Sequence, residues 1–148
     1  MLIGQFLIKA GSSGRIAFPK RFRGELGERI IVTRGFEGAI MVVSEKNWKS
    51  LLEGTEDKPF LLSRARDTQR YLLGGATVVD LDSQGRFVIP EYLREFAQIT
   101  GEVVAIGLYR YAEIWDKKRW DVYQKNAEKN IASIAEGLIE NIGNGKLF

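Results

Sequence analysis

Residues 14–23 read GRIAFPKRFR, and residues 85–94 read GRFVIPEYLR. Aligned without a gap, the two stretches share a Gly-Arg pair, three apolar residues, a proline and a closing arginine. A second similarity lies downstream, where SEKNW at residues 44–48 corresponds to DKKRW at residues 116–120. Two copies are too few for a solenoid, which needs at least three units. The repeat therefore predicts two homologous half-domains related by a pseudo-twofold axis.

Each copy predicts the same order of elements. An extended run enters a turn with glycine or serine, and the Gly-Arg pair leads out of it into a short apolar strand. The proline is expected at the first position of a helix, where its missing N–H costs nothing. The first helix should end near Leu26-Gly27 and the second near Gly101. Beyond the helices, β-branched runs predict hairpins that pair residues 30–33 with 39–43 and 103–106 with 112–115.

Further helices are predicted outside the hairpins. Ser44 and Asp116 are suitable N-cap residues for the helices that follow them. Another helical run spans residues 60–73. An amphipathic C-terminal helix is indicated by apolar residues at spacings of three and four: Trp120, Tyr123, Ala127, Ile131, Ile134 and Leu138. The expected division is a half-domain at 1–53, a linker with a helix at 54–74, a half-domain at 75–120, and a C-terminal helix and tail at 121–148.

The composition excludes several functional classes. The 148 residues include no cysteine and no histidine, so the chain lacks disulfides, thiolate nucleophiles and the commonest general base and metal ligand. No nucleophile–base pair or nucleotide-binding glycine loop is visible, and we expect no enzyme, cofactor, metal site or small-molecule substrate. The sequence shows no membrane-spanning run and no signal peptide, so we expect no membrane partner and a cytoplasmic location.

The net charge of +3 is concentrated in one segment. This segment is residues 9–23, which contain no acidic residue and five basic ones: Lys9, Arg15, Lys20, Arg21 and Arg23. The matching window of the second copy, residues 80–94, holds two arginines against three acidic residues. A local excess of positive charge favours a polyanionic partner. We therefore hypothesise that the first copy is the stronger phosphate-contacting surface.

The doubled Gly-Arg-apolar-Pro unit, the segment WDKKRW at residues 115–120 and the total length resemble the MraZ family. The hallmark of that family is an Asp-x-x-x-Arg motif in each half. Residues 82–86 (DSQGR) match it fully, whereas residues 11–15 read GSSGR, so that Gly11 stands where the motif has an aspartate.

The resemblance implies an α+β fold of two AbrB-like swapped-hairpin half-domains, with a small β-barrel-like core, flanking helices and the C-terminal amphipathic helix. Within the motif turn, Asp82 can cap backbone N–H groups. Gly11 has no side chain for this role and is expected to close its turn with a positive φ, while Ser12 and Ser13 supply weaker hydroxyl caps. Trp48, Trp115 and Trp120 are expected as core or interface anchors, since each falls in an apolar pattern.

DNA binding requires cations that neutralise phosphates on a rigid element that fits a groove. We assign Arg15 and Arg86 to base or groove contacts, because a guanidinium can bond guanine through two N–H groups. Gly14 and Gly85 are expected to let the backbone approach the sugar-phosphate closely. The candidate DNA-binding set is completed by Ser13 and by four cations expected at phosphates: Lys9, Lys20, Arg21 and Arg23.

By resemblance, the expected function is that of a sequence-specific transcriptional regulator located at the nucleoid. It would bind double-stranded DNA at tandem direct repeats in the promoter of the division and cell-wall gene cluster, as a ring-forming homo-oligomer. Two alternatives remain. A protein-interaction scaffold without DNA binding is favoured by the missing aspartate at Gly11. An AbrB-like antitoxin is disfavoured by the fused double half-domain.

Overall fold

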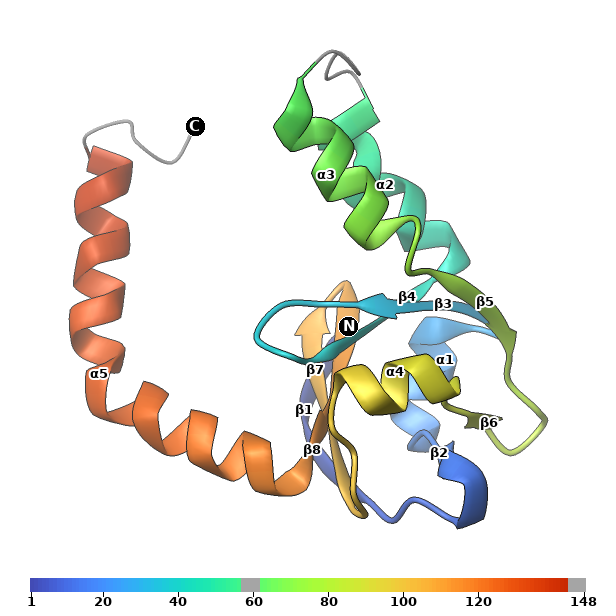
Figure 1. Cartoon of the computed structure of the whole chain (residues 1–148). Coiled ribbons are helices and arrows are strands. Elements are labelled where there is room, and N and C mark those ends of the chain that lie inside the picture. Colours follow the sequence, from blue (N-terminus) through green and yellow to red (C-terminus); the bar gives the residue numbers. More distant parts are fainter. Residues whose placement is uncertain (57–61, 144–148) are drawn as a thin grey trace. The chain divides into compact units, whose positions relative to one another are not determined.

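The computed structural model describes residues 1–56 and 62–143. Its contacts divide the chain into two units, Met1–Lys117 and Lys118–Phe148. The described elements, shown in Figure 1, are β1 (Leu2–Ile8), a 3-10 turn (Ser12–Gly14), β2 (Arg15–Ala17), α1 (Lys20–Leu26), β3 (Arg29–Arg34), β4 (Ile40–Ser44), α2 (Glu45–Glu56), α3 (Ser63–Leu72), β5 (Thr77–Asp80), β6 (Arg86–Val88), α4 (Glu91–Phe96), β7 (Val103–Tyr109), β8 (Tyr111–Asp116) and α5 (Lys117–Gly143). The predicted α+β class is confirmed.

Six strands form one antiparallel sheet in the order β1-β7-β8-β4-β3-β5, and β2 and β6 form a separate antiparallel ribbon next to α1 and α4 (Figure 1). The two copies of the repeat contribute strands to each other. Strand β1 of the first copy pairs with β7 of the second, with Leu2 opposite Tyr109. Strand β5 of the second copy pairs with β3 of the first, with Arg29 opposite Asp80. Each copy therefore extends its hairpin with a strand from the other.

The core is built from equivalent apolar positions of the two repeats. Phe22 and Leu93, which match in the alignment, are both fully buried. Phe18 of the first copy stacks on Phe87 of the second with ring centroids 5.3 Å apart, and Phe6 meets Phe22 edge-on at 5.0 Å. Burying aromatic side chains of this size is a major source of folding free energy. The repeat is therefore also a shared packing unit.

Three predicted helix boundaries are wrong. Pro19 and Pro90 precede their helices instead of opening them, since their ψ angles of 149° and 140° are extended. The second helix ends at Phe96 and not near Gly101. Its end is a Schellman motif, in which Gln98 takes a φ of 54° and the N–H of Ile99 donates to the Arg94 carbonyl at 3.0 Å. Glutamine fills the position where a glycine is usual, so the sequence gives no sign of this helix end.

The predicted N-cap at Ser44 is confirmed, because its Oγ accepts a hydrogen bond from the backbone N–H of Asn47 at 3.1 Å. The buried Oδ1 of Asp116 accepts hydrogen bonds from the N–H and the hydroxyl of Thr100, at 3.1 and 3.2 Å. This carboxylate ties the loop after α4 to the start of α5.

The remaining predicted helices are observed in the part of the chain that the structure describes. The run predicted at 60–73 corresponds to α3, whereas Phe60, Leu61 and the linker residues 57–59 lie outside the described residues, as does the tail 144–148. Helix α5 continues through Gly137 to Gly143. Across residues 1–56 and 62–143, every helix is too short or too polar to cross a bilayer.

Candidate nucleic-acid interface

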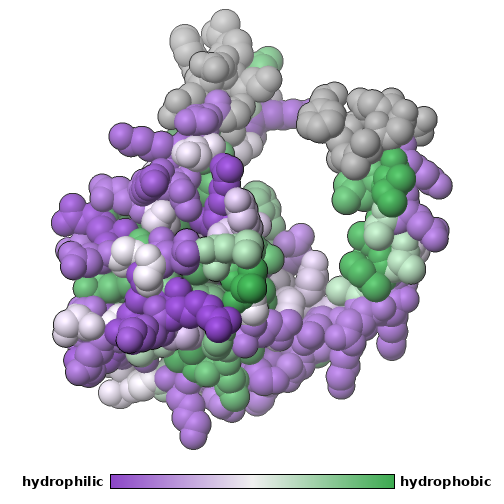
Figure 2. Space-filling model, turned by 180° about the vertical axis from the view of Figure 1, so that it is seen from behind, coloured by the Kyte–Doolittle hydropathy of each residue, from purple (hydrophilic) through white to green (hydrophobic). Residues whose placement is uncertain are grey.

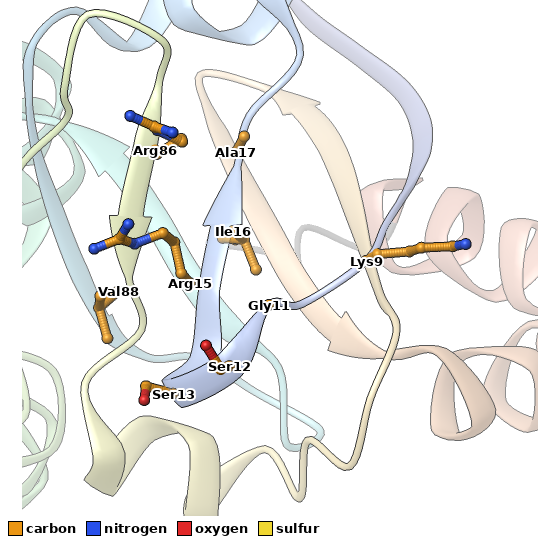
Figure 3. Close-up of a pocket in the computed structure, with 9 residues that line it drawn as sticks. All are labelled: Lys9, Gly11, Ser12, Ser13, Arg15, Ile16, Ala17, Arg86 and Val88. Atoms are coloured by element: carbon orange, nitrogen blue, oxygen red, sulfur yellow. The ribbon is translucent and has the colours of Figure 1, made fainter.

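Two arginines occupy the outward face of the β2–β6 ribbon. The middle residue of each strand, Ile16 or Phe87, is buried, so its neighbours point outward. Arg15 lies opposite Val88, and Ala17 lies opposite Arg86, which places the two arginines diagonally on one face. Figure 3 shows the side chain of Arg15 crossing toward β6, with Arg86 farther along the same ribbon.

The ribbon borders an open concavity of about 460 Å³. In Figure 3, Lys9 points away from the two arginines, and Ser12 and Ser13 lie where the chain enters β2. None of the nine lining residues is acidic: Lys9, Gly11, Ser12, Ser13, Arg15, Ile16, Ala17, Arg86 and Val88. The surface is therefore positively charged and lined by small residues, which suits the approach of a polyanion.

The turns that precede the two arginines have matching backbone hydrogen bonds. The N–H of Gly11 donates to the Arg15 carbonyl at 2.8 Å, and the N–H of Asp82 donates to the Arg86 carbonyl at 3.1 Å. Inside the turns, Gly14 N–H donates to the Gly11 carbonyl at 3.3 Å, and the N–H of residue 85 donates to the Asp82 carbonyl at 2.9 Å. The two motif turns are thus closed by the same pair of backbone hydrogen bonds, although Ser13 of the first is left-handed and only the second contains the aspartate.

Asp82 caps its turn, as predicted. Its Oδ1 accepts hydrogen bonds from the backbone N–H groups of Gln84 and Arg86, both at 2.9 Å. Its Oδ2 accepts from the Nε of Arg86 at 2.7 Å and completes an exposed ion pair. The backbone hydrogen bond from Arg86, followed by the side-chain one, holds the pKa of the Asp82 carboxyl below its usual range.

The expectation that Gly11 takes a positive φ is wrong. Its φ is −73° and its ψ −176°, an extended conformation that any residue adopts. The left-handed residues of the turn are Ser13, with φ 64°, and Gly14, with φ 77°. No side chain caps the 3-10 turn, and none of the ion pairs in residues 1–56 and 62–143 includes Arg15.

Gly14 and Gly85 are explained by packing within the protein. A Cβ on Gly85 would lie 2.0 Å from Cδ of Arg23, and one on Gly14 would lie 2.4 Å from Cδ of Arg94. Each arginine closes one copy of the repeat and lies across the glycine of the other copy. The Nε atoms of both are buried and make no hydrogen bond within the described structure. The sequence alone does not predict this exchange of arginines between the two copies, although the Gly-Arg pair and the closing arginine recur together.

The remaining predicted cations do not all gather at the ribbon. Lys20 and Arg23 line a second concavity of about 600 Å³ with the turn that contains Asp82 and Gly85. A guanidinium N–H of Arg23 approaches the Ser83 carbonyl at 3.4 Å. Arg21 is exposed on α1. The basic N-terminal segment is therefore divided between two concavities, and Lys9 and Arg15 are the members that line the same one as Arg86.

A family model described as "MraZ protein, putative antitoxin-like" matches the chain twice, at residues 1–71 and 72–142. The chain belongs to the MraZ family. A relative named "Transcriptional regulator MraZ" from Natranaerobius thermophilus is 38% identical over 140 residues, which cover 95% of this chain and 98% of the relative. Relatives of the same name from Desulfitobacterium hafniense and Halothermothrix orenii are 39% and 37% identical over 143 residues, or 97% of this chain and 99% of each relative.

Membership of the MraZ family agrees with the internal duplication, since each copy of the motif falls within one of the two matches. The name that the relatives carry describes a regulator and not a class of enzyme. Among the described residues, no three Asp or Glu side chains converge in a way that could hold a metal ion.

Proposed function

We propose that this chain is a DNA-binding transcriptional regulator whose β2–β6 ribbon enters the major groove. The observation that carries the proposal is the diagonal placement of Arg15 and Arg86 on the outward face of one two-stranded ribbon (Figure 3). A ribbon of this kind fits the major groove, and a guanidinium there can bond guanine O6 and N7 together. The shared name of the MraZ relatives supports a regulatory role.

The other predicted contacts surround this ribbon. Lys9 and Ser13 border the same concavity and are proposed to contact the phosphate backbone. Lys20 and Arg21 are exposed on α1 and are proposed as further phosphate contacts. The stem of Arg23 packs against Gly85, so its contribution to DNA binding is proposed to be mainly the support of the second turn.

We further propose that the protein acts as a ring-shaped homo-oligomer on tandem repeats in the promoter of the division and cell-wall gene cluster. Helix α5 presents a stripe of exposed apolar residues, including Ile131, Ile134 and Leu138 at 58%, 56% and 51% exposure. Figure 2 shows apolar surface over the C-terminal part of this helix. An exposed stripe of this kind is typical of a surface that another chain covers. Linked copies bind tandem DNA repeats with higher avidity than one copy does.

The fold supports the same proposal. Because β1 and β5 each pair with a hairpin of the other copy, we propose that the large unit is a swapped-hairpin fusion of two half-domains. The boundaries at 53, 74 and 120 and the location at the nucleoid stay predictions.

The test is a binding titration at two salt concentrations on a duplex that carries the region upstream of this chain's own coding sequence. Arg15→Ala and Arg86→Ala should each weaken binding, by about 5- to 150-fold where a base contact is lost. Arg64→Ala, in an exposed arginine of α3, is the matched control and should change little. Binding that both ribbon variants leave unchanged contradicts the proposal that the ribbon enters the groove, whereas a wild-type protein that does not bind the duplex favours the protein-interaction scaffold.

A further inference from the structure

We propose that the two repeats divide DNA recognition, and this inference rests on the proposed function. Asp82 is a positioning residue that orients Arg86 to read a base pair. Arg15, whose turn has Gly11 at the equivalent place, contacts DNA as an adaptable cation. The same ribbon therefore carries one oriented and one adjustable guanidinium.

The geometry at Asp82 fixes Arg86 at two points. One carboxylate oxygen accepts from the Arg86 backbone N–H at 2.9 Å, and the other accepts from its Nε at 2.7 Å. Since the side chain is tied to its own backbone through one carboxylate, its rotamer freedom is reduced before any ligand arrives. Its two terminal nitrogens make no hydrogen bond within residues 1–56 and 62–143 and can still donate. Two such N–H groups are what a bidentate contact to guanine requires.

Arg15 follows a turn that is closed by the same backbone hydrogen bonds but has no carboxylate. A Cβ on Gly11 would lie 4.0 Å from the Cβ of Arg15, so an acidic group at position 11 would be within reach of the Arg15 side chain. The unrestrained side chain loses more conformational freedom when it docks on a base. A phosphate tolerates many orientations of a cation, and a base edge does not. A guanidinium that is not held in one orientation, such as that of Arg15, therefore suits the phosphate backbone.

Asp82→Asn separates the positioning role of Asp82 from its capping role. The asparagine Oδ1 can still accept from the N–H groups of Gln84 and Arg86, whereas its Nδ2 cannot accept from the Arg86 Nε. The readout is the ratio of affinities for the upstream duplex and for a scrambled duplex of equal length and composition. We expect this ratio to fall about 2- to 10-fold, as expected when one long side chain must be ordered on binding, while the affinity for the scrambled duplex rises because a negative charge is removed.

Gly11→Asp tests the inference in the opposite direction. The extended φ of Gly11 accepts any residue, and a Cβ there meets only the Arg15 carbonyl at 3.6 Å and its Cβ at 4.0 Å. The new carboxylate should orient Arg15, raise the affinity ratio about 2- to 10-fold, and weaken binding to the scrambled duplex because a negative charge is added. This variant leaves the second turn intact, so it tests the inference even if Asp82→Asn fails to fold.

The experiment includes Asp82→Asn in the Arg86→Ala background. Because Asp82 acts through Arg86, the substitution should lower the affinity ratio no further there, whereas a merely structural role would lower the ratio in both backgrounds. The inference is overturned if Asp82→Asn leaves the ratio unchanged, if its effect persists without Arg86, or if Gly11→Asp brings no gain. A wild-type protein that binds neither duplex overturns the proposed function instead, so the two failures are distinct.

Discussion

Gly85→Ala tests whether the exchanged arginines hold the motif turns in place. Gly85 has a φ of 74°, and a Cβ at this position would lie 2.0 Å from Cδ and 2.7 Å from Cγ of Arg23. No real contact is that short, so the arginine must leave its place across the turn. Arg23 belongs to the first repeat and Gly85 to the second, and the perturbation therefore acts at their junction.

Two contributions determine how much Gly85→Ala lowers the free energy of unfolding. An alanine in the left-handed region costs about 1–2 kcal/mol. Displacing the half-buried stem of Arg23 removes the packing of about two methylene groups, or roughly 1 kcal/mol when partial burial is considered. The expected loss is about 2–3 kcal/mol. Arg23→Ala alone should cost about 1 kcal/mol, and the double variant should be no less stable than Gly85→Ala, because the clash has already removed the stem contact.

Urea unfolding followed by tryptophan fluorescence measures these differences, since Trp115 is buried. The protein concentration must be constant, because the stability of an oligomer depends on it. Gly24→Ala is the matched control. Gly24 lies in α1 with nothing within 4 Å of a new Cβ, and alanine should stabilise that helix by about 0.5–1 kcal/mol. If the losses from Arg23→Ala and Gly85→Ala add in full, the two residues do not interact as described.

Two further predictions concern the core and a partly buried carboxyl. Phe22→Ala should lower the free energy of unfolding by about 3–5 kcal/mol, because it empties the site where Phe6 and Phe18 meet, and the urea midpoint reports the loss. Burial raises the pKa of the Glu113 carboxyl, and Glu37 adds to the effect although the Trp115 N–H opposes it. The folded state therefore binds the proton more tightly, and stability is greater below the unfolded pKa and falls as pH rises through the folded pKa. Glu113→Gln should accordingly be more stable than wild type at neutral pH and lose this advantage in acid; an equal advantage at both pH values would contradict the assignment.

The sequence predicts the local elements well because their signals are local. Apolar positions, β-branched runs and the serine cap at Ser44 each depend on a few neighbouring residues. The end of α4 at Gln98 could not be predicted, since its Schellman motif uses a residue that rarely adopts a left-handed conformation. The prediction of a positive φ at Gly11 is wrong for a related reason. A sequence shows which residues tolerate a positive φ, but the geometry of the turn decides which position needs it.

The sequence predicts which residues belong to the candidate site, but it does not predict how the fold arranges them. The duplicated Gly-Arg pair pointed to Arg15 and Arg86, and the ribbon brings them together. The contact of Arg23 with Gly85 joins positions far apart in the chain, and no local pattern carries such information. Lys20 was grouped with Arg15 by sequence proximity, whereas the fold places it beside the other turn.

The pairing of Leu2 with Tyr109 has a consequence for synthesis of the protein. The first strand leaves the ribosome early but finds its partner strand only when most of the chain has been translated. During that interval β1 is an unpaired edge with apolar residues such as Ile3 and Leu7, which is a target for chaperones and for aggregation. Closing so long a loop also slows folding. Slowing translation after the first repeat should therefore reduce the yield of native protein.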